Sequence, residues 1–213
     1  MRFADFSLEK NLWEKGFSRV VGVDEVGRGA WAGPVLAAAV VFSQERRLGF
    51  RLADSKQLSP ARREALAEAI KEKALFWSVS RADAEFIEAN GIGAATEKAI
   101  RLALAGLKES PEFVLVDYFK LSFWPKERQD PVKFGDAISN SIAAASILAK
   151  VARDSLMRDL GKQYPQYGFE AHKGYGTKFH REMIKENGLC PLHRRSFVPK
   201  FDSRLLKLQS SGL

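Results

Sequence analysis

The chain is organised around the stretch Val20-Val21-Gly22-Val23-Asp24-Glu25-Val26-Gly27-Arg28-Gly29. It begins as an apolar run typical of a buried strand and ends in two carboxylates and a glycine-flanked arginine. Burying a carboxylate is costly unless it is paired or binds a metal. We therefore expect Asp24 and Glu25 to bind a divalent metal, with Arg28 at a phosphate. In the alternative interpretation, Glu25 is a surface carboxylate paired with Arg28.

In a regular strand, Asp24 and Glu25 would point to opposite faces. For both to reach one metal, we expect the strand to end or bulge at this point. Other apolar runs predict further strands at 34–42, 75–80, 113–117 and 130–135, the first of them forming a hairpin with 20–25. The fourth strand closes on Asp117, which can meet Asp24 if their strands are neighbours, because ligands collect at the carboxyl ends of open α/β sheets.

Strands dominate the early part of the chain, and helices dominate the later part. Ser59 and Pro60 open a helix as N-cap and first-turn residue. Apolar periodicity predicts the others at 83–90, 94–107, 136–162 and 177–187, with a short one around 201–208, whereas 164–176 is predicted as a loop. This order of elements predicts an α/β fold with a mixed central sheet.

Two more acids lie on the predicted long helix. Asp136 and Asp154 are 18 residues apart, which is roughly 27 Å along a helix, so at most one of them belongs to a shared metal site. Asp154 has Lys150 and Arg158 four residues away on either side, and an ion pair accounts for it. Asp136 stands at the helix start, where it is either the N-cap or a ligand.

Composition restricts the possible partners. The 213 residues carry a net charge of +8 and are 46% hydrophobic, typical of a globular protein with a polyanionic partner. Between Lys150 and Arg204 there are 12 Lys and Arg against 6 Asp and Glu. One cysteine, Cys190, excludes an internal disulfide and fits a reducing compartment. The first ten residues include Asp5, Glu9 and Lys10 and show no apolar region of a signal peptide, and the longest apolar run, Val35 to Phe42, is too short to span a bilayer, so we expect a cytoplasmic protein.

Five segments in order resemble bacterial ribonuclease HII, the type 2 ribonuclease H. They are Val23-Asp24-Glu25-Val26-Gly27-Arg28-Gly29, Asp54-Ser55-Lys56, Ser141-Ile142-Ala143-Ala144-Ala145-Ser146-Ile147-Leu148-Ala149-Lys150-Val151, His172-Lys173-Gly174-Tyr175-Gly176-Thr177 and His193-Arg194-Arg195-Ser196-Phe197. The resemblance is collinear from about Val20 to Phe197. One departure is Ala30-Trp31 in place of the more usual proline–leucine, and we expect Trp31 to alter the rim of the site.

The resemblance implies a ribonuclease H-like core at residues 1–163, with a mixed five-stranded sheet flanked by helices. It also implies a basic, helical C-terminal extension at residues 164–213 that completes the substrate site. The implied activity is endonucleolytic cleavage of the RNA strand of RNA–DNA hybrids, and cleavage 5′ of single ribonucleotides in duplex DNA. The products carry 5′-phosphate and 3′-hydroxyl ends. The implied partner is nucleic acid rather than a membrane, and we expect a monomer.

By the same resemblance, the catalytic and metal-binding residues are Asp24, Glu25, Asp117 and Asp136, which favours Asp136 over Asp154. Carboxylates without histidine or cysteine favour Mg²⁺ or Mn²⁺, in a two-metal site. The resemblance assigns substrate binding to Gly27, Arg28, Gly29 and Tyr175. Further candidate substrate contacts are Ser55, Lys56, Lys150, Lys173, Arg194 and Arg195.

Two alternatives remain open. One is a basic nucleic-acid-binding protein without catalysis, and the other is a nuclease of the same fold with another substrate. Three histidines, His172, His180 and His193, and Cys190 match no familiar zinc spacing. We interpret them as structural residues or as neighbours of a phosphate.

Overall fold

The computed structural model of the protein describes residues 3–45, 48–52, 55 and 58–199. One five-stranded sheet runs through it in the order β3-β2-β1-β4-β5. Its strands are β1 (Val20–Val26), β2 (Val35–Val41), β3 (Phe76–Ala82), β4 (Phe113–Asp117) and β5 (Gln129–Val132). β2 pairs antiparallel with β1 and β3, whereas β4 pairs parallel with β1 and β5. The predicted mixed sheet is confirmed.

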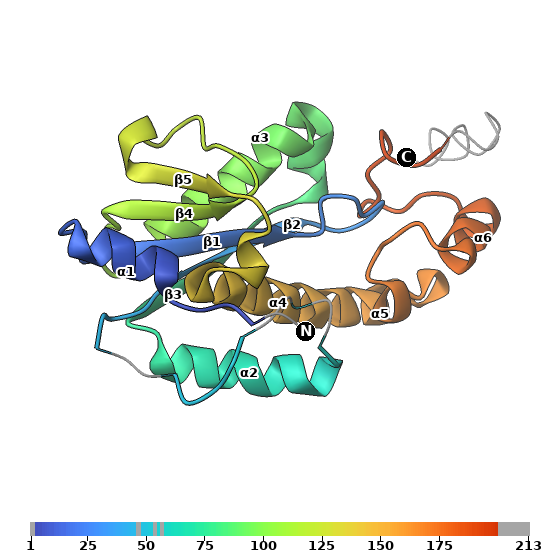
Figure 1. The fold of residues 1–213 in the computed structure, drawn as a ribbon. Coiled ribbons are helices and arrows are strands. Elements are labelled where there is room, and N and C mark those ends of the chain that lie inside the picture. The colour runs from blue at the N-terminus through green and yellow to red at the C-terminus, as the bar shows by residue number, and fades with distance from the viewer. Residues whose placement is uncertain (1–2, 46–47, 53–54, 56–57, 200–213) are drawn as a thin grey trace.

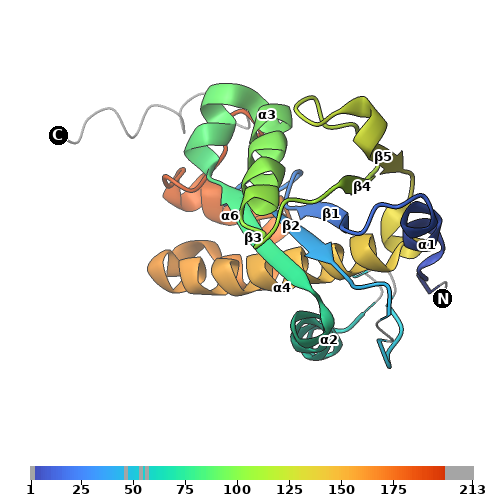
Figure 2. The ribbon, with the colours of Figure 1, turned by 90° about the vertical axis from the view of Figure 1, so that its left-hand side faces the viewer.

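Helices cover both faces of the sheet (Figures 1 and 2). They are α1 (Ser7–Glu14), α2 (Pro60–Lys73), α3 (Ala84–Ala105), α4 (Asn140–Gln163), α5 (Phe169–His172) and α6 (Lys178–Asn187). α3 lies on one face, and α4 with α2 lies on the other, while α5 and α6 extend beyond the end of β1 and β2. The fold is therefore a helix–sheet–helix sandwich with a helical extension at one end.

The strands alternate between two cores, as the two-residue period of a strand requires. Val21 and Val23 of β1 face the α3 side. Ala38 and Val40 of β2 pack with α2 and with the small residues Ala143 to Ala145 of α4. Because those α4 residues are small, the helix lies very close to the sheet.

Gly22 marks the closest approach of α4 to β1. A Cβ atom on Gly22 would lie 2.1 Å from the carbonyl carbon of Ser141 and 2.3 Å from the nitrogen of Ile142. Backbone meets backbone here, so no side chain can move aside. This contact holds the first turn of α4 against β1, so that Ser146, one turn further along the helix, lies beside Asp24 near the carboxyl end of the strand.

Several predicted boundaries need correction. The long helix begins at Asn140, with Ser139 as its cap, because the Ser139 hydroxyl accepts the Ile142 N–H at 3.1 Å. Asp136 instead lies in a separate 3₁₀ turn, Gly135–Ala137. The stretch predicted as a loop at 164–176 contains a 3₁₀ turn, Pro165–Tyr167, and helix α5. The predicted helix around 201–208 lies outside the described residues.

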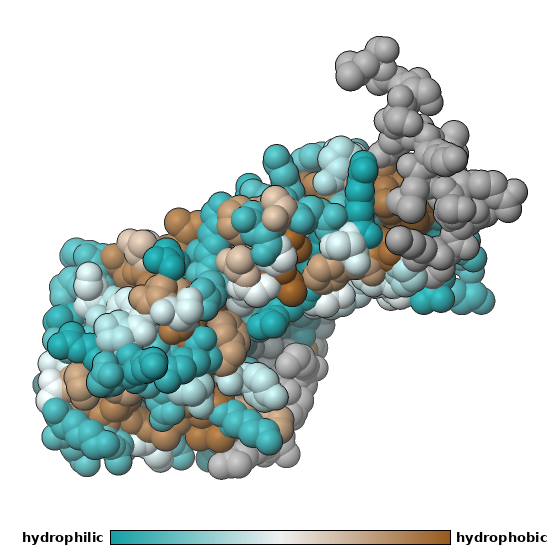
Figure 3. Space-filling view, turned by 90° about the horizontal axis from the view of Figure 1, so that it is seen from above, coloured by the Kyte–Doolittle hydropathy of each residue, from teal (hydrophilic) through white to brown (hydrophobic). Residues whose placement is uncertain are grey.

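The two helices predicted at 83–90 and 94–107 are joined in α3, with a break at Gly91 where φ is 80°. α1 was not predicted. Seen from above, hydrophilic residues cover most of the surface and apolar residues are exposed in scattered patches (Figure 3). Within the described part of the chain, no helix is both long and apolar enough to span a bilayer.

Candidate active site

Asp24 and Asp117 lie at the carboxyl ends of adjacent parallel strands. Val23 of β1 is paired with Val116 of β4, so the two aspartates follow at the same edge of the sheet. They border one pocket of 340 Å³. The pocket is lined by Asp24, Glu25, Val26, Ser55, Asp117, Ser146, Lys150 and Tyr175. The predicted meeting of the β1 and β4 carboxylates is confirmed.

The Asp24 carboxylate is under electrostatic strain. It is buried, and this burial, followed by the charges of Glu25 and Asp117, raises its pKa well above the usual range. A hydrogen bond from Ser146 and one from the Glu25 N–H, 2.7 Å from Asp24 Oδ1, lower the pKa but do not cancel the rise. A cation would relieve this repulsion, and the all-oxygen donor set fits Mg²⁺ or Mn²⁺.

Ser146 is a site residue that the sequence interpretation missed. Its hydroxyl hydrogen-bonds the Asp24 carboxylate and lies 3.0 Å from the hydroxyl of Ser55, which is also buried. Ser146 reaches this position because α4 packs closely on β1 at Gly22. The only signal in the sequence was a run of small residues on the helix.

Glu25 reaches the pocket without the expected bulge. The pairing of β1 with β2 stays in register from Val21 to Val26. Glu25 Oε1 also lies 3.7 Å from Arg28 Nη1, so the ion pair with Arg28 exists as well, although the Glu25 side chain is only 15% exposed. The two interpretations of Glu25 are therefore compatible.

Asp136 is buried beside the pocket rather than in its lining. The N–H of its neighbour Gly135 donates to Asp117 Oδ1 at 2.7 Å, which ties the 3₁₀ turn to the end of β4. Across the described residues, no three His, Cys, Asp or Glu side chains are close enough to hold a metal ion as they stand. The role of Asp136 as a ligand stays a prediction.

Asp154 is excluded from the pocket by its ion pairs. Lys150 Nζ lies 2.8 Å from Asp154 Oδ1, and Arg63 Nη2 lies 3.7 Å from Oδ2. The ion-pair interpretation is confirmed, although Arg158 pairs with Glu64 instead.

The loop between β1 and β2 that carries Gly27, Gly29 and Gly33, here called the glycine loop, is held by hydrogen bonds from two buried arginines. Arg194 donates to the carbonyl of Arg28 at 2.8 Å and to that of Gly33 at 2.9 Å. Arg153 donates to the carbonyl of Pro34 at 3.1 Å, and its Nε would lie 2.1 Å from a Cβ on Gly27. Arg194 was expected to contact a phosphate, but its side chain is fully buried under the loop and is bonded to the carbonyl groups of Arg28 and Gly33.

Tyr175 comes from the C-terminal part of the chain and reaches the same pocket as Asp24. Its loop is tied to the glycine loop, since the N–H groups of Trp31 and Ala32 donate to the Gly174 carbonyl at 2.8 and 3.2 Å. A Cβ on Gly176 would lie 2.3 Å from the Trp31 ring. Trp31 thus supports the tyrosine loop, a more specific role than the expected change to the rim.

The remaining predicted substrate contacts divide into three groups. Ser55 and Lys150 line the pocket. Lys173 donates to the Glu170 carbonyl, and Arg195 lines a different hollow beside Glu88 and Cys190. Lys56 lies outside the described residues.

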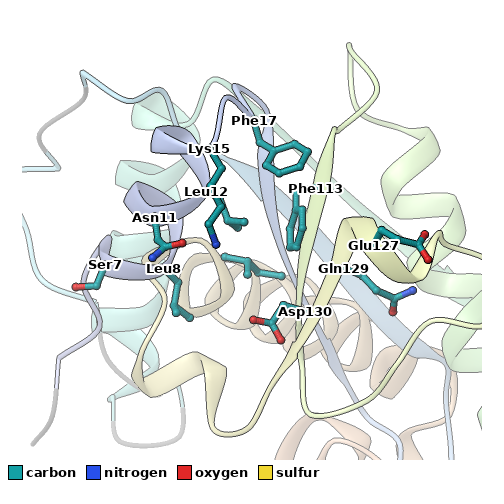
Figure 4. A pocket seen from close by; sticks show the side chains of 11 residues that line it. Ser7, Leu8, Asn11, Leu12, Lys15, Phe17, Phe113, Glu127, Gln129 and Asp130 are labelled. Atoms are coloured by element: carbon teal, nitrogen blue, oxygen red, sulfur yellow. The ribbon is translucent and has the colours of Figure 1, made fainter.

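A larger hollow of 500 Å³ lies between α1 and strands β4 and β5 (Figure 4). Its lining mixes Leu8, Leu12 and Phe113 with Glu127 and Asp130. It contains none of the predicted site residues. The smaller pocket is the candidate active site because the strand-end carboxylates border it.

His180 and His193 are buried in the C-terminal extension, consistent with the structural interpretation. Burial, and the proximity of other imidazoles, lower the pKa of His180 to about 4 and that of His193 to about 3. Both side chains are therefore neutral at pH 7.

This burial predicts acid sensitivity. An unfolded histidine has a pKa near 6.5, so the unfolded chain binds more protons below that pH. The contribution of these neutral histidines to the free energy of unfolding is complete above pH 6.5 and is lost as the pH falls towards 4. The free energy of unfolding then falls by at most about 1.4 kcal/mol per pH unit for each histidine. Urea unfolding followed from pH 7.5 to 5 measures it.

The raised pKa values of the Asp24 and Glu9 carboxyl groups, both caused first by burial, act in the opposite sense, because the folded state then binds the extra proton. The titration is therefore best done in a background that carries both Asp24→Asn and Glu9→Gln. A free energy of unfolding that stays constant between pH 7 and 5 in that background would contradict the prediction.

Comparison with known proteins agrees with this architecture. The ribonuclease HII family model matches residues 21–200. Ribonuclease HII from Endomicrobium trichonymphae is 47% identical over 197 residues, which cover 92% of this chain and 93% of the relative. The ribonuclease H2 structure from Pyrococcus horikoshii OT3 aligns with a TM-score of 0.71 and 26% identity, covering 89% of this chain and 99% of that chain. Bst-RNase HIII in complex with Mn²⁺ aligns with a TM-score of 0.63 and 22% identity, covering 80% and 63%.

The sheet order, the strand-end carboxylates and these similarities define a type 2 ribonuclease H, an endonuclease that acts on RNA–DNA hybrids. The chain belongs to the ribonuclease HII family.

Proposed function

We propose that the chain cuts the RNA strand of RNA–DNA hybrids and also incises 5′ of single ribonucleotides in duplex DNA, leaving 5′-phosphate and 3′-hydroxyl ends. The observation that carries this proposal is the shared pocket, in which Asp24, Glu25 and Asp117 face Tyr175. Carboxylates supply the hydrolytic chemistry, and the tyrosine supplies an aromatic surface for a sugar or base. A cytoplasmic location is supported by the single, free Cys190.

The proposed metal ligands are Asp24, Glu25, Asp117 and Asp136, and the proposed ions are Mg²⁺ or Mn²⁺. Their all-oxygen chemistry supports hard cations, and Mn²⁺ is present in the structure of Bst-RNase HIII. The chemistry that these four carboxylates would hold in place is that of two divalent ions, which would activate a water and stabilise the leaving 3′-oxygen. The Ser146 hydroxyl orients the Asp24 carboxylate for this binding.

Discrimination between RNA and DNA requires contact with the 2′-hydroxyl. We assign this contact to the backbone of Gly27 and Gly29, and a phosphate contact to Arg28. Arg194 supports this assignment, because it holds the Arg28 carbonyl and so positions the loop. Lys150, in the pocket lining, is a further phosphate contact.

The domain division at residues 1–163 and 164–213 becomes part of this proposal. α4 ends at Gln163, and Tyr175 follows in the extension. Neither part alone supplies both the carboxylates and the tyrosine. The extension therefore completes the substrate site.

A nicking assay tests the proposal. With Mg²⁺, we expect a nick 5′ of one ribonucleotide in duplex DNA. Stacking on an aromatic side chain is worth about 1–3 kcal/mol, so Tyr175→Ala should reduce this cleavage about tenfold or more, with a smaller loss on a long hybrid. Tyr175→Phe should retain most of the activity, because the ring remains.

The matched control is Trp77→Ala, which removes an exposed aromatic residue from β3, away from the pocket. Equal loss on both substrates in Tyr175→Ala would favour a nuclease of the same fold with another substrate. If the unmodified protein leaves the duplex without any nick, a non-catalytic nucleic-acid-binding protein is favoured.

A further inference from the structure

A continuous chain of buried imidazoles connects the core of the extension to Tyr175. His180 Nδ1 lies 3.0 Å from the Tyr175 carbonyl oxygen, and His180 Nε2 lies 3.1 Å from His193 Nε2. His193 Nδ1 in turn lies 2.9 Å from the backbone nitrogen of Cys190. The chain therefore runs from Cys190 through two rings to the loop that carries the tyrosine.

These contacts determine where each proton lies. The closest partner of His193 Nδ1 is the Cys190 N–H at 2.9 Å, which can only donate, whereas the Cys190 carbonyl oxygen is farther away at 3.3 Å; we therefore assign Nδ1 as the acceptor and the proton of His193 to Nε2. The Tyr175 carbonyl can only accept, so His180 Nδ1 carries the proton and His180 Nε2 accepts from His193. The proton positions were assigned from opposite ends of this hydrogen-bonded series. They agree at the bond between the two rings, where His193 Nε2 donates and His180 Nε2 accepts.

His172 completes the arrangement by the same logic. Its Nδ1 accepts the Gly174 N–H at 3.1 Å, so its Nε2 donates to the Tyr167 carbonyl at 2.7 Å. The ring of His172 stacks on that of His180 with centroids 4.3 Å apart. Two histidines thus hold the backbone on both sides of the tyrosine, one at Gly174 and the other at Tyr175.

We propose that His180 and His193 are positioning residues that hold the Tyr175 carbonyl through a single set of neutral tautomers, and so fix how the tyrosine projects over the carboxylate pocket. The inference rests on the proposed function of Tyr175. It goes further by attributing the orientation of Tyr175 to the hydrogen bonds of His180 and His193, which we call the relay. These two histidines contact neither the substrate nor the metal in the proposed function.

Other contacts also hold the loop, since the Gly174 carbonyl accepts the N–H groups of Trp31 and Ala32, and the Tyr175 N–H donates to the His172 carbonyl at 3.0 Å. Tyr175 itself is 37% exposed, and the Arg153 guanidinium carbon lies 5.4 Å from the centroid of its ring. The Tyr175 carbonyl also accepts the Thr177 N–H at 2.8 Å, within the loop itself. His180 provides the bond that connects this carbonyl to the buried core.

The lowered pKa values of His180 and His193 keep both rings in the neutral state that the tautomers require at pH 7. A proton added to His180 Nε2 would face the Nε2–H of His193, so the relay has no place for it. The titratable groups that face the two rings are His172, Tyr167 and Cys190, with Glu170 and Lys173 beside His172.

Nitrogen-15 NMR of the full chain at pH 7 tests the relay directly. The expected spectrum has the proton of His180 on Nδ1 and the protons of His172 and His193 on Nε2. An Nε2–H tautomer for His180 would overturn the inference. This measurement needs no variant and does not depend on the role of Tyr175.

Two substitutions separate positioning from general stability. In His180→Asn the amide nitrogen can occupy the place of Nδ1 and still donate to the Tyr175 carbonyl, whereas the longer His180→Gln cannot. His180→Asn loses the bond to His193, whereas His180→Gln can place its Oε1 near the position of Nε2 and still accept from His193, so each variant keeps one of the two bonds. We expect His180→Asn to keep most single-ribonucleotide cleavage and His180→Gln to lose about three- to tenfold, the equivalent of one hydrogen bond. The two variants should lose similar amounts of thermal stability.

Equal activity of the two variants would overturn the inference, because a purely structural histidine would not distinguish them. Tyr175→Ala in the same assay tells the two proposals apart. If that variant shows no selective loss, the proposed role of the tyrosine fails, and the NMR tautomers then confirm or refute the relay by themselves.

Discussion

Asp24→Asn is expected to lower the turnover number about 10³-fold or more while binding of an RNA–DNA hybrid survives. The charge stabilisation that a metal supplies is several kcal/mol, and each 1.36 kcal/mol corresponds to tenfold in rate. Asparagine keeps the shape of the side chain but removes the charge that holds the cation. Single-turnover cleavage and hybrid binding, each with and without Mg²⁺, measure the two effects separately.

The same substitution should stabilise the metal-free protein. Burial, Glu25 and Asp117 all disfavour the charged Asp24 carboxylate, so a neutral amide removes a source of repulsion. Thermal unfolding in a chelating buffer should therefore shift upward. Near-normal cleavage by Asp24→Asn would contradict the assignment of the active site.

Asp154→Asn is the matched control, because this buried acid of α4 was the alternative to Asp136 as a metal ligand and does not line the pocket. Asp154 is buried against Lys150 and Arg63, and breaking a buried ion pair typically costs about 3–5 kcal/mol. We expect this variant to lose stability while retaining most of its turnover. Asp24→Asn should thus lose turnover without losing stability, whereas Asp154→Asn should lose stability without losing most of its turnover.

Gly22→Ala is expected to have the largest effect on folding. The added Cβ would meet the backbone of Ser141 at 2.1 Å, and overpacking of this kind costs about 3 kcal/mol at the upper end of its usual range. For a chain of this size that corresponds to a Tm lower by roughly 6–12 °C. It should also reduce cleavage, since pushing α4 off β1 moves Ser146 away from Asp24.

Gly93→Ala serves as the control for Gly22→Ala. Gly93 is exposed on α3, and a Cβ there would meet nothing within 4 Å. Alanine is favoured over glycine in a helix by up to about 1 kcal/mol, so this variant should be neutral or slightly more stable. A Tm for Gly22→Ala equal to that of Gly93→Ala would contradict the close helix–strand contact.

Local patterns predicted much of this molecule correctly. The apolar runs ending in Asp24 and Asp117 became neighbouring strands, and Ser59 and Thr177 cap α2 and α6. Such features depend on residues close together in the chain, so periodicity and capping chemistry are enough to find them. The family resemblance, carried by five short motifs, assigned the activity.

Other features escaped because they depend on contacts between distant segments. Arg194 looked like a phosphate ligand in a basic stretch, yet it is buried beneath Arg28 and Gly33. Ser146 looked like a small packing residue, yet it hydrogen-bonds Asp24. Asp136 looked like the start of the long helix, but Ser139 caps it instead.

The amino-acid sequence by itself therefore determined the class of fold, the strands that carry the acids and the family. Only the tertiary structure decided which polar side chains point into the pocket and which brace it from behind. The physical reason is that charge and polarity are properties of a residue, whereas burial and hydrogen-bond partners are properties of its surroundings. Those surroundings are assembled only when the helices pack against the sheet.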